Sequence, residues 1–307
     1  MLHHTFSEDI KDELCHFEYL SCNKKAILSS FLTNLLMINF SNNGEEWELR
    51  SQHLPTIKLI SAFLSELFKV HKKILVSKEK ALNKHRAYKL LFNINHKEAV
   101  DSLQLNETYP KRILKNSIDK RAYLVGAFLS GGSIGSIDKS QYHLEIRSNK
   151  LNYLRLIQKL LHEFNLSITL LQRKNTYVLY IKKAIDVSDF LKIIGANVAM
   201  QHLEDKIIAR DYYTNLRRMN NLDVANLNKT VSAGQTQIQM INKIRKSNEF
   251  KNQPDKFKFY CSIRLQNPEA SLKEIVSIFN NKYRISITRT GINHYVIKIK
   301  ELFKALL

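Results

Sequence analysis

The sequence has little cysteine and no long hydrophobic run, and both absences exclude classes of protein. Its three cysteines, Cys15, Cys22 and Cys261, are too few and too scattered in 307 residues for a disulfide framework, which suits a reducing compartment. Cys15 and Cys22 with His16 match no zinc-binding spacing, so we expect no metal and no cofactor. No run of 18 uncharged apolar residues occurs, and the acidic, amphipathic start MLHHTFSEDIKDELCHF is unlike a signal peptide. We expect a soluble, cytoplasmic protein without a membrane partner.

Acidic residues are scarce beside basic ones. The chain holds 48 Lys plus Arg against 28 Asp plus Glu, which gives a net charge of +20. Clustered cations release condensed counterions when they meet phosphates, so this charge favours a nucleic-acid partner. The alternative is a compositional bias, since lysine outnumbers arginine 34 to 14.

An order of elements recurs in the first 200 residues, and it predicts a duplicated α+β domain. Apolar spacing predicts helices at 23–40 and 55–68, strands at 47–52, 72–77 and 88–94, and a short helix from 97. The same order follows with helices at 121–130, 151–164 and 184–194 and strands at 142–148, 167–171 and 176–182. Arg50-Ser51 matches Arg147-Ser148 at an offset of 97 positions. We therefore predict repeats at about 20–105 and 120–195 within a domain over 1–215.

The helix at 121–130 ends in small residues, in the stretch RAYLVGAFLSGGSIGS. Gly126, Ala127, Ser130, Gly131 and Gly132 would let two helices cross closely where the copies meet. A phosphate-binding loop is the alternative for 131–140, but the required Lys-Ser/Thr pair is missing there and no strand precedes it.

The segment LVGAFLSGG (124–132) resembles the paired helices of LAGLIDADG homing endonucleases. The resemblance implies a metal-binding acid at the penultimate position of each motif. This chain has Gly131 there, and Leu35 in the first copy, LSSFLTNLL (28–36). Phosphodiester hydrolysis by bound cations needs hard oxygen ligands, so the resemblance implies a scaffold without nuclease activity. We interpret Asp138 as a loop residue rather than a displaced metal ligand.

The last 88 residues predict a separate, basic, all-α module after a linker at 216–228. They carry 15 Lys plus Arg against 6 Asp plus Glu, net +9. A helix is expected at 256–266, and Ser271 with Glu274 forms a capping-box pattern that begins the next. Apolar residues spaced by three and four positions predict a last helix at 288–306. We predict a DNA-binding domain over 229–307, with a helix-turn-helix at about 270–304.

The outward face of the last helix is polar and basic at its amino end. Such side chains donate to base edges and phosphates in the major groove, whereas a solvated helical hairpin without a ligand is the alternative. The residues expected to contact DNA are Arg284, Thr288, Arg289, Thr290, Asn293, His294, Tyr295 and Lys298. Backbone contacts are expected at Asn228, Lys229 and Lys273.

Three further runs, ANLNKTVSAGQTQI (225–238), LQNPEASLKEI (265–275) and TRTGINHYVIKI (288–299), resemble the WhiA family of bacterial transcription regulators. The resemblance implies a degenerate LAGLIDADG domain joined to a helix-turn-helix, and a sequence-preferring regulator acting in cell division and chromosome segregation. It implies double-stranded DNA as partner, nucleoid association, and another transcription regulator or RNA polymerase as protein partner. A nucleoid-coating protein and a LAGLIDADG nuclease or RNA maturase remain as alternatives.

Overall fold

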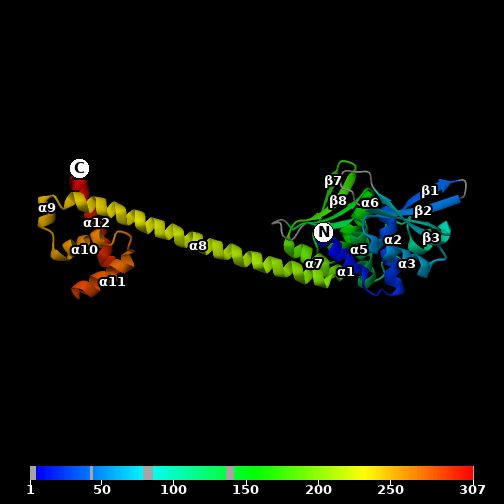
Figure 1. The fold of residues 1–307 in the computed structure, drawn as a ribbon, viewed down its shortest axis with the longest axis horizontal. Coiled ribbons are helices and arrows are strands. Elements are labelled where there is room, and N and C mark those ends of the chain that lie inside the picture. The colour runs from blue at the N-terminus through cyan, green and yellow to red at the C-terminus, as the bar shows by residue number, and fades with distance from the viewer. Residues whose placement is uncertain (1–4, 42–43, 79–85, 136–141, 307) are drawn as a thin grey trace. The chain divides into compact units, whose positions relative to one another are not determined.

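The computed structural model, drawn as a ribbon in Figure 1, divides into two units. It describes residues 5–41, 44–78, 86–135 and 142–306. The first unit is Met1–Ala209 and the second is Arg210–Leu307. The larger core lies in the first unit and the smaller one in the second.

The first unit contains the same arrangement of helices and strands twice. The first copy runs through α2 (Ser21–Leu35), β1 (Met37–Ser41), β2 (Gly44–Ser51), α3 (Leu54–Leu67), β3 (His71–Lys78), β4 (Arg86–Asn93) and α4 (His96–Leu103). The second runs through α5 (Ser117–Gly131), β5 (Gly132–Ile134), β6 (Leu144–Ser148), α6 (Leu151–Glu163), β7 (Thr169–Arg173), β8 (Thr176–Ile181) and α7 (Ala184–Ile194). Each copy forms a four-stranded antiparallel sheet, in the orders β1-β2-β4-β3 and β5-β6-β8-β7.

The offset of 97 positions marks equivalent places in the two copies. Ser51 and Ser148 end equivalent strands, and Leu54 and Leu151 begin the helices that follow. The duplicated α+β architecture predicted from the sequence is therefore confirmed, since two sheets with one strand order repeat along the chain.

Two short strands replace segments expected to be helix or loop. The helix predicted at 23–40 ends at Leu35, and β1 then pairs with β2, with Ile38 opposite Trp47. The glycine pair continues into β5, which pairs with β6. Short apolar runs fit helix and strand equally well, and pairing with a neighbouring strand decides between them here. Each copy is thus helix, strand, strand, helix, strand, strand, helix.

Helix α1 (Phe6–Cys15) precedes the first copy and was not predicted. Thr5 and Glu8 form a capping box at its start. Ile10 and Leu14 are fully buried in the core of the first unit. The N-terminal segment is therefore part of the packed unit.

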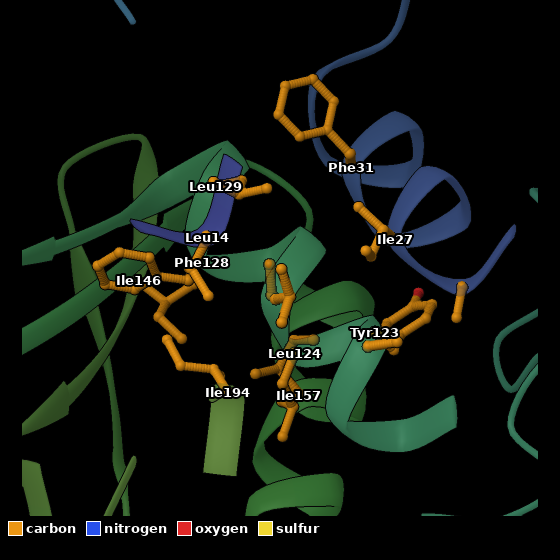
Figure 2. Close-up of a cluster of buried hydrophobic side chains, with 14 of the residues drawn as sticks. Leu14, Ile27, Phe31, Tyr123, Leu124, Phe128, Leu129, Ile146, Ile157 and Ile194 are labelled. Atoms are coloured by element: carbon orange, nitrogen blue, oxygen red, sulfur yellow. The ribbon is translucent and has the colours of Figure 1, made fainter. Parts of the chain in front are cut away.

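Helices α2 and α5 cross closely at the centre of the first unit, as the small residues of α5 predict. Figure 2 shows Ile27 and Phe31 of α2 in the same buried cluster as Tyr123, Leu124 and Phe128 of α5. A Cβ atom added at Gly126 would collide with the Ile27 carbonyl oxygen and lie 2.8 Å from the Cβ of Ser30. The absent side chain at Gly126 is what permits this approach.

Residues 216–228, expected to form a linker, are helical and lie inside α8 (Asn197–Ile244). No glycine or proline occurs between 197 and 233, and the asparagines that suggested a linker each cost a helix only tenths of a kcal/mol (~0.5). After α8 come α9 (Asn248–Lys251), α10 (Asp255–Gln266), α11 (Leu272–Tyr283) and α12 (Arg289–Ala305). Within the described residues, no helix has both the length and the apolar character needed to cross a bilayer.

Replacing Gly126 with alanine tests the helix crossing, because the crossing decides whether the free energy of unfolding rises or falls. Alanine favours an exposed helix by about 1 kcal/mol over glycine, but here the added methyl group meets the fixed backbone of Ile27. We expect Gly126→Ala to lower the free energy of unfolding by about 1–3 kcal/mol, the usual cost of overpacking. Trp47, the single tryptophan, is fully buried in β2 and reports denaturant unfolding of this unit by fluorescence. An unchanged or raised stability would contradict the close crossing.

Candidate nucleic-acid interface

Helices α10, α11 and α12 and the end of α8 pack around one small apolar core in the second unit. Helix α11 contributes Ile275 and Phe279, and α12 contributes Ile292, Val296 and Ile299. These buried positions recur at three and four residues, as the sequence predicts. Helix α10 and the C-terminal end of α8 complete the core with Ile241, Ile244, Phe257, Tyr260, Cys261 and Ile263.

The start of α12 is fixed by hydrogen bonds from polar side chains. The Asn280 amide nitrogen donates to the Ile287 carbonyl at 3.2 Å, and the Ile287 N–H donates back to Asn280 Oδ1 at 2.8 Å. Thr288 is the N-cap, and its hydroxyl oxygen accepts from the Gly291 N–H at 3.2 Å. The capping box predicted at Ser271 and Glu274 is present at the start of α11. The turn between α11 and α12 thus holds the second helix in one position.

The polar face of α12 is exposed, with few ties to the rest of the protein. Arg289, Thr290, Asn293 and His294 are all solvent-exposed. Within the described part of the chain, none of these four side chains forms a hydrogen bond or an ion pair. Arg289, Thr290 and Asn293 lie within about one turn of each other at the amino end of the helix. Their donors are therefore available to a ligand.

Two other residues expected to contact DNA lie partly against the core. The Tyr295 ring is half-buried and packs 5.7 Å from the Tyr260 ring and 5.9 Å from the Phe257 ring, between ring centroids. Burial raises the pKa of its hydroxyl. Lys298 extends over Phe257, with its Nζ 5.9 Å from the ring centroid. The Tyr295 ring thus packs against α10, and Lys298 is half-buried beside the Phe257 ring.

The remaining expected contacts are exposed on separate elements. Arg284 follows α11 with a positive φ of 49°, and Lys273 lies in the first turn of α11. Asn228 and Lys229 are exposed on α8. Helix α12, its turn and α11 therefore bring most of the expected residues together, whereas Asn228 and Lys229 belong to another helix.

Arg264 is a buried cation that the sequence did not single out. It is 2 % exposed, and its Nη1 donates to the carbonyl of Ala270 at 2.6 Å. Nearby, a Cβ atom at Gly234 of α8 would collide with the Pro268 carbonyl oxygen. Arg264 thus binds the loop before α11, and the absent side chain at Gly234 lets that loop approach α8. In the sequence, Arg264 looks like one more basic residue of a basic module.

The two positions expected to lack metal-binding acids, Leu35 and Gly131, are the last residues of α2 and α5. A Cβ atom at Gly131 would collide with the Arg147 carbonyl oxygen, and Leu35 ends α2. The Asn34 amide nitrogen donates to Ser130 Oγ at 2.9 Å. Asp138 lies outside the described residues. Among the residues that are described, no group of three or more His, Cys, Asp or Glu could hold a metal ion.

Two protein-family models match the chain, one mainly in each unit. Residues 120–213 match a model of the WhiA LAGLIDADG-like domain, and residues 216–303 match a model of the WhiA C-terminal HTH domain. The helix-turn-helix predicted from the last two helices is therefore confirmed at the level of the family.

Curated relatives match along nearly the whole chain. A probable cell division protein WhiA of Staphylococcus haemolyticus is 32% identical over 304 residues, covering 97% of this chain and 96% of the relative. The protein of the same name in Lysinibacillus sphaericus is 30% identical, with 98% and 97% covered.

Solved structures agree on the fold. A full-length WhiA crystal structure from Thermatoga maritima superposes with a TM-score of 0.61 at 24% identity, over 98% of this chain and 99% of that one. A structure of the N-terminal LAGLIDADG domain alone gives a TM-score of 0.52 at 25% identity, over 63% of this chain and 92% of that one.

Replacing Asn280 with alanine tests how the start of α12 is held. The change removes both hydrogen bonds to Ile287 and leaves a backbone N–H without its partner, at a cost of about 1–3 kcal/mol. We expect the Ile287 amide to exchange with deuterium ~5- to 150-fold faster, and duplex affinity to fall while net charge is unchanged. Ser277→Ala, at an exposed position of the same helix, is the matched control. Equal protection of Ile287 in both variants would contradict the role of Asn280.

Proposed function

The chain belongs to the WhiA family, and from this premise we propose that it is a DNA-binding transcription regulator that reads sequence through α12. The observation that carries the proposal is the exposed face of Arg289, Thr290, Asn293 and His294 on a helix whose opposite face is buried. Guanidinium, amide, hydroxyl and imidazole groups are those that bond base edges in the major groove. A helix-turn-helix presents such groups from the first turns of its second helix.

Phosphate contacts and base contacts have separate tasks in this mechanism. Lys273 in the first turn of α11, Arg284 after α11 and Lys298 within α12 are basic side chains whose contacts to phosphates would fix the register of α12 on the duplex. The N-terminal backbone N–H groups of α12 add partial positive charge toward the same phosphates. Affinity should therefore fall steeply with salt, whereas discrimination between sequences rests on Arg289, Thr290, Asn293 and His294.

The names of the relatives support a role in cell division for this chain. The Staphylococcus haemolyticus and Lysinibacillus sphaericus proteins are both named as probable cell division proteins. Both align over nearly their full lengths, so the whole architecture is shared rather than the helix-turn-helix alone. We infer that the chain acts on transcription or chromosome organisation linked to division, at the nucleoid.

We also infer that the first unit does not cut DNA. Metal-assisted hydrolysis needs oxygen ligands for the cations that stabilise the attacking and leaving oxygens. Gly131 and Leu35 occupy the positions where the homing-endonuclease motif carries its acids, and neither supplies an oxygen from its side chain. A carboxylate at Gly131 would also have to displace the backbone at Arg147.

The sequence-reading role is tested by the double variant Arg289→Ala with Asn293→Ala. Each lost base contact should cost about 1–3 kcal/mol of discrimination. We expect affinity for a preferred site to fall at least tenfold more than affinity for random duplex, measured by fluorescence anisotropy at physiological salt. The preferred site comes from genome-wide footprints, where discrete peaks are expected. Equal loss on both duplexes, or uniform coverage of the genome, would favour a nucleoid-coating protein instead.

Lys273→Ala is the matched control for this double variant. Lys273 is exposed near the start of α11, and its proposed contact is to a phosphate. Its loss should weaken binding to both duplexes alike and reduce the slope of log affinity against log salt by about 1. A selective loss on the preferred site would place Lys273 among the base-reading residues.

Incubation with supercoiled plasmid tests the loss of nuclease activity. With millimolar Mg²⁺ or Mn²⁺, the purified chain should leave the plasmid supercoiled on an agarose gel, because the motif positions lack carboxylates. A LAGLIDADG nuclease with a plasmid carrying its target serves as the positive control. Metal-dependent nicking that co-elutes with the protein would overturn the inference.

A further inference from the structure

A cavity of about 390 Å³ lies where α2 and α5 end in the first unit. Its walls come from both copies of the repeat and from α1. The lining residues with polar or charged side chains include Lys11, Asn34, Ser133, Arg147, Ser148 and Asn149. None of the described lining residues is acidic. The cavity thus occupies the ends of the paired helices, but its polar groups are cations, amides and hydroxyls.

Lys11 brings a positive charge into this cavity. Its side chain is half-buried on α1, with Nζ 6.0 Å from the centroid of the Phe128 ring. None of the ion pairs between described residues includes Lys11. Burial lowers the pKa of its ammonium group, although the charge of Glu8 opposes this shift. An anion in the cavity would give the Lys11 ammonium group a direct ionic partner.

Arg147 adds a second positive charge at the rim. Arg147 Nε donates to Glu145 Oε2 at 2.9 Å, and Arg173 Nη1 donates to Glu145 Oε1 at 2.8 Å. Burial alone would raise the pKa of Glu145, but the two guanidinium groups outweigh it and lower that pKa. Two arginines share one carboxylate, so one unit of positive charge is left over beside the cavity.

The helix ends do not restore a preference for cations. The C-terminal carbonyls of a helix carry partial negative charge, which favours bound metals. Here the Lys150 ammonium group already donates to the Thr33 carbonyl of α2 at 2.6 Å. The Asn34 amide nitrogen lies 3.3 Å from the Arg147 carbonyl oxygen. The chain's own donors therefore bind the Thr33 carbonyl of α2 and the Arg147 carbonyl of β6, and Lys11 and Arg147 would repel a divalent cation.

We propose that this cavity binds the phosphate group of a small phosphorylated ligand. Lys11 and Arg147 would supply the opposing charges, and the Ser133 and Ser148 hydroxyls and the Asn149 amide would donate to the remaining phosphate oxygens. Its volume lies in the range of small-molecule sites, about 300–1,000 Å³. The proposal concerns the first unit and stands apart from DNA binding by α12.

Helix α1 contributes Lys11 to the lining of the cavity. The repeated pattern contains no counterpart of α1, which precedes the first copy. Ser7 of α1 donates to the Ile134 carbonyl at 2.9 Å and accepts from the Ile134 N–H at 2.8 Å. Lys11 is therefore held beside the glycine pair by contacts that α1 makes with β5.

Ligand-dependent stability of the full chain tests the proposal. The probes are inorganic phosphate and adenosine 5′-monophosphate, against NaCl at matched ionic strength, with Trp47 fluorescence reporting unfolding of the first unit. A ligand that binds only the folded state raises the unfolding midpoint as its concentration rises. We expect at least one of the two phosphates to raise the midpoint beyond the NaCl control. Lys11→Met, which keeps the apolar stem of the side chain, should lower the affinity at least tenfold.

Two further variants separate the site from general charge effects. Lys58→Met removes the same charge from an exposed position of α3 and should respond to phosphate as the unchanged protein does. Arg147→Gln provides a second lesion of the cavity and should also weaken the response. No response beyond NaCl, or an equal response in Lys11→Met and Lys58→Met, would overturn the proposal. So would a loss of duplex affinity in Lys11→Met with the response to both phosphates intact, since the partner would then be DNA.

Discussion

The close approach of α2 and α5 is the constraint on which the first unit depends. At Gly126 the backbone of one helix meets the Ile27 carbonyl of the other, with no room for a methyl group. The same closeness extends to Gly131, which faces the carbonyl oxygen of Arg147 at the end of β6. The packing that joins the two copies therefore also fixes the backbone at Gly131, where a side chain would need the Arg147 carbonyl to shift.

The two copies keep one electrostatic arrangement and differ in another. Glu48 and Glu145, 97 positions apart, are both buried carboxylates bound by the arginine two residues later, Arg50 or Arg147. In each case the charged neighbours outweigh burial and lower the carboxylate pKa. The residues that precede α3 and α6 differ, however: His53 lies 3.1 Å from Asp12 of α1, whereas Lys150 reaches into α2. Helix α1 thus makes the pseudo-dimer asymmetric.

Periodicity and capping patterns predicted most elements, because those signals are local. The Ser271–Glu274 capping box and the buried stripe of α12 depend on residues close in sequence. Strand β5 depends on pairing with β6, a long-range contact that no local pattern reports. The Thr5–Glu8 pair was a usable signal for α1, since it has the spacing of a capping box. The acidic residues of that segment had suggested only an amphipathic start.

In the candidate interface, too, local spacing predicted some features, whereas others depend on contacts between distant residues. The exposed face of α12 follows from helical spacing, since the residues opposite Ile292, Val296 and Ile299 must face outward. The half-buried position of Tyr295 could not be read from spacing, because it depends on the rings of Phe257 and Tyr260 on another helix. Arg264 likewise gains its role only from a loop carbonyl brought to it by the fold.

The second unit holds α12 in place through residues that do not lie on its exposed polar face. Asn280 fixes the Ile287 backbone, Arg264 fixes the loop before α11, and Tyr295 packs behind the helix. Arg289, Thr290 and Asn293 take no part in these contacts. Substitutions on the exposed face should therefore cost the fold little, because surface changes away from such contacts usually shift stability by less than about 0.5 kcal/mol. The exposed face of α12 can thus vary while the core of the second unit stays the same.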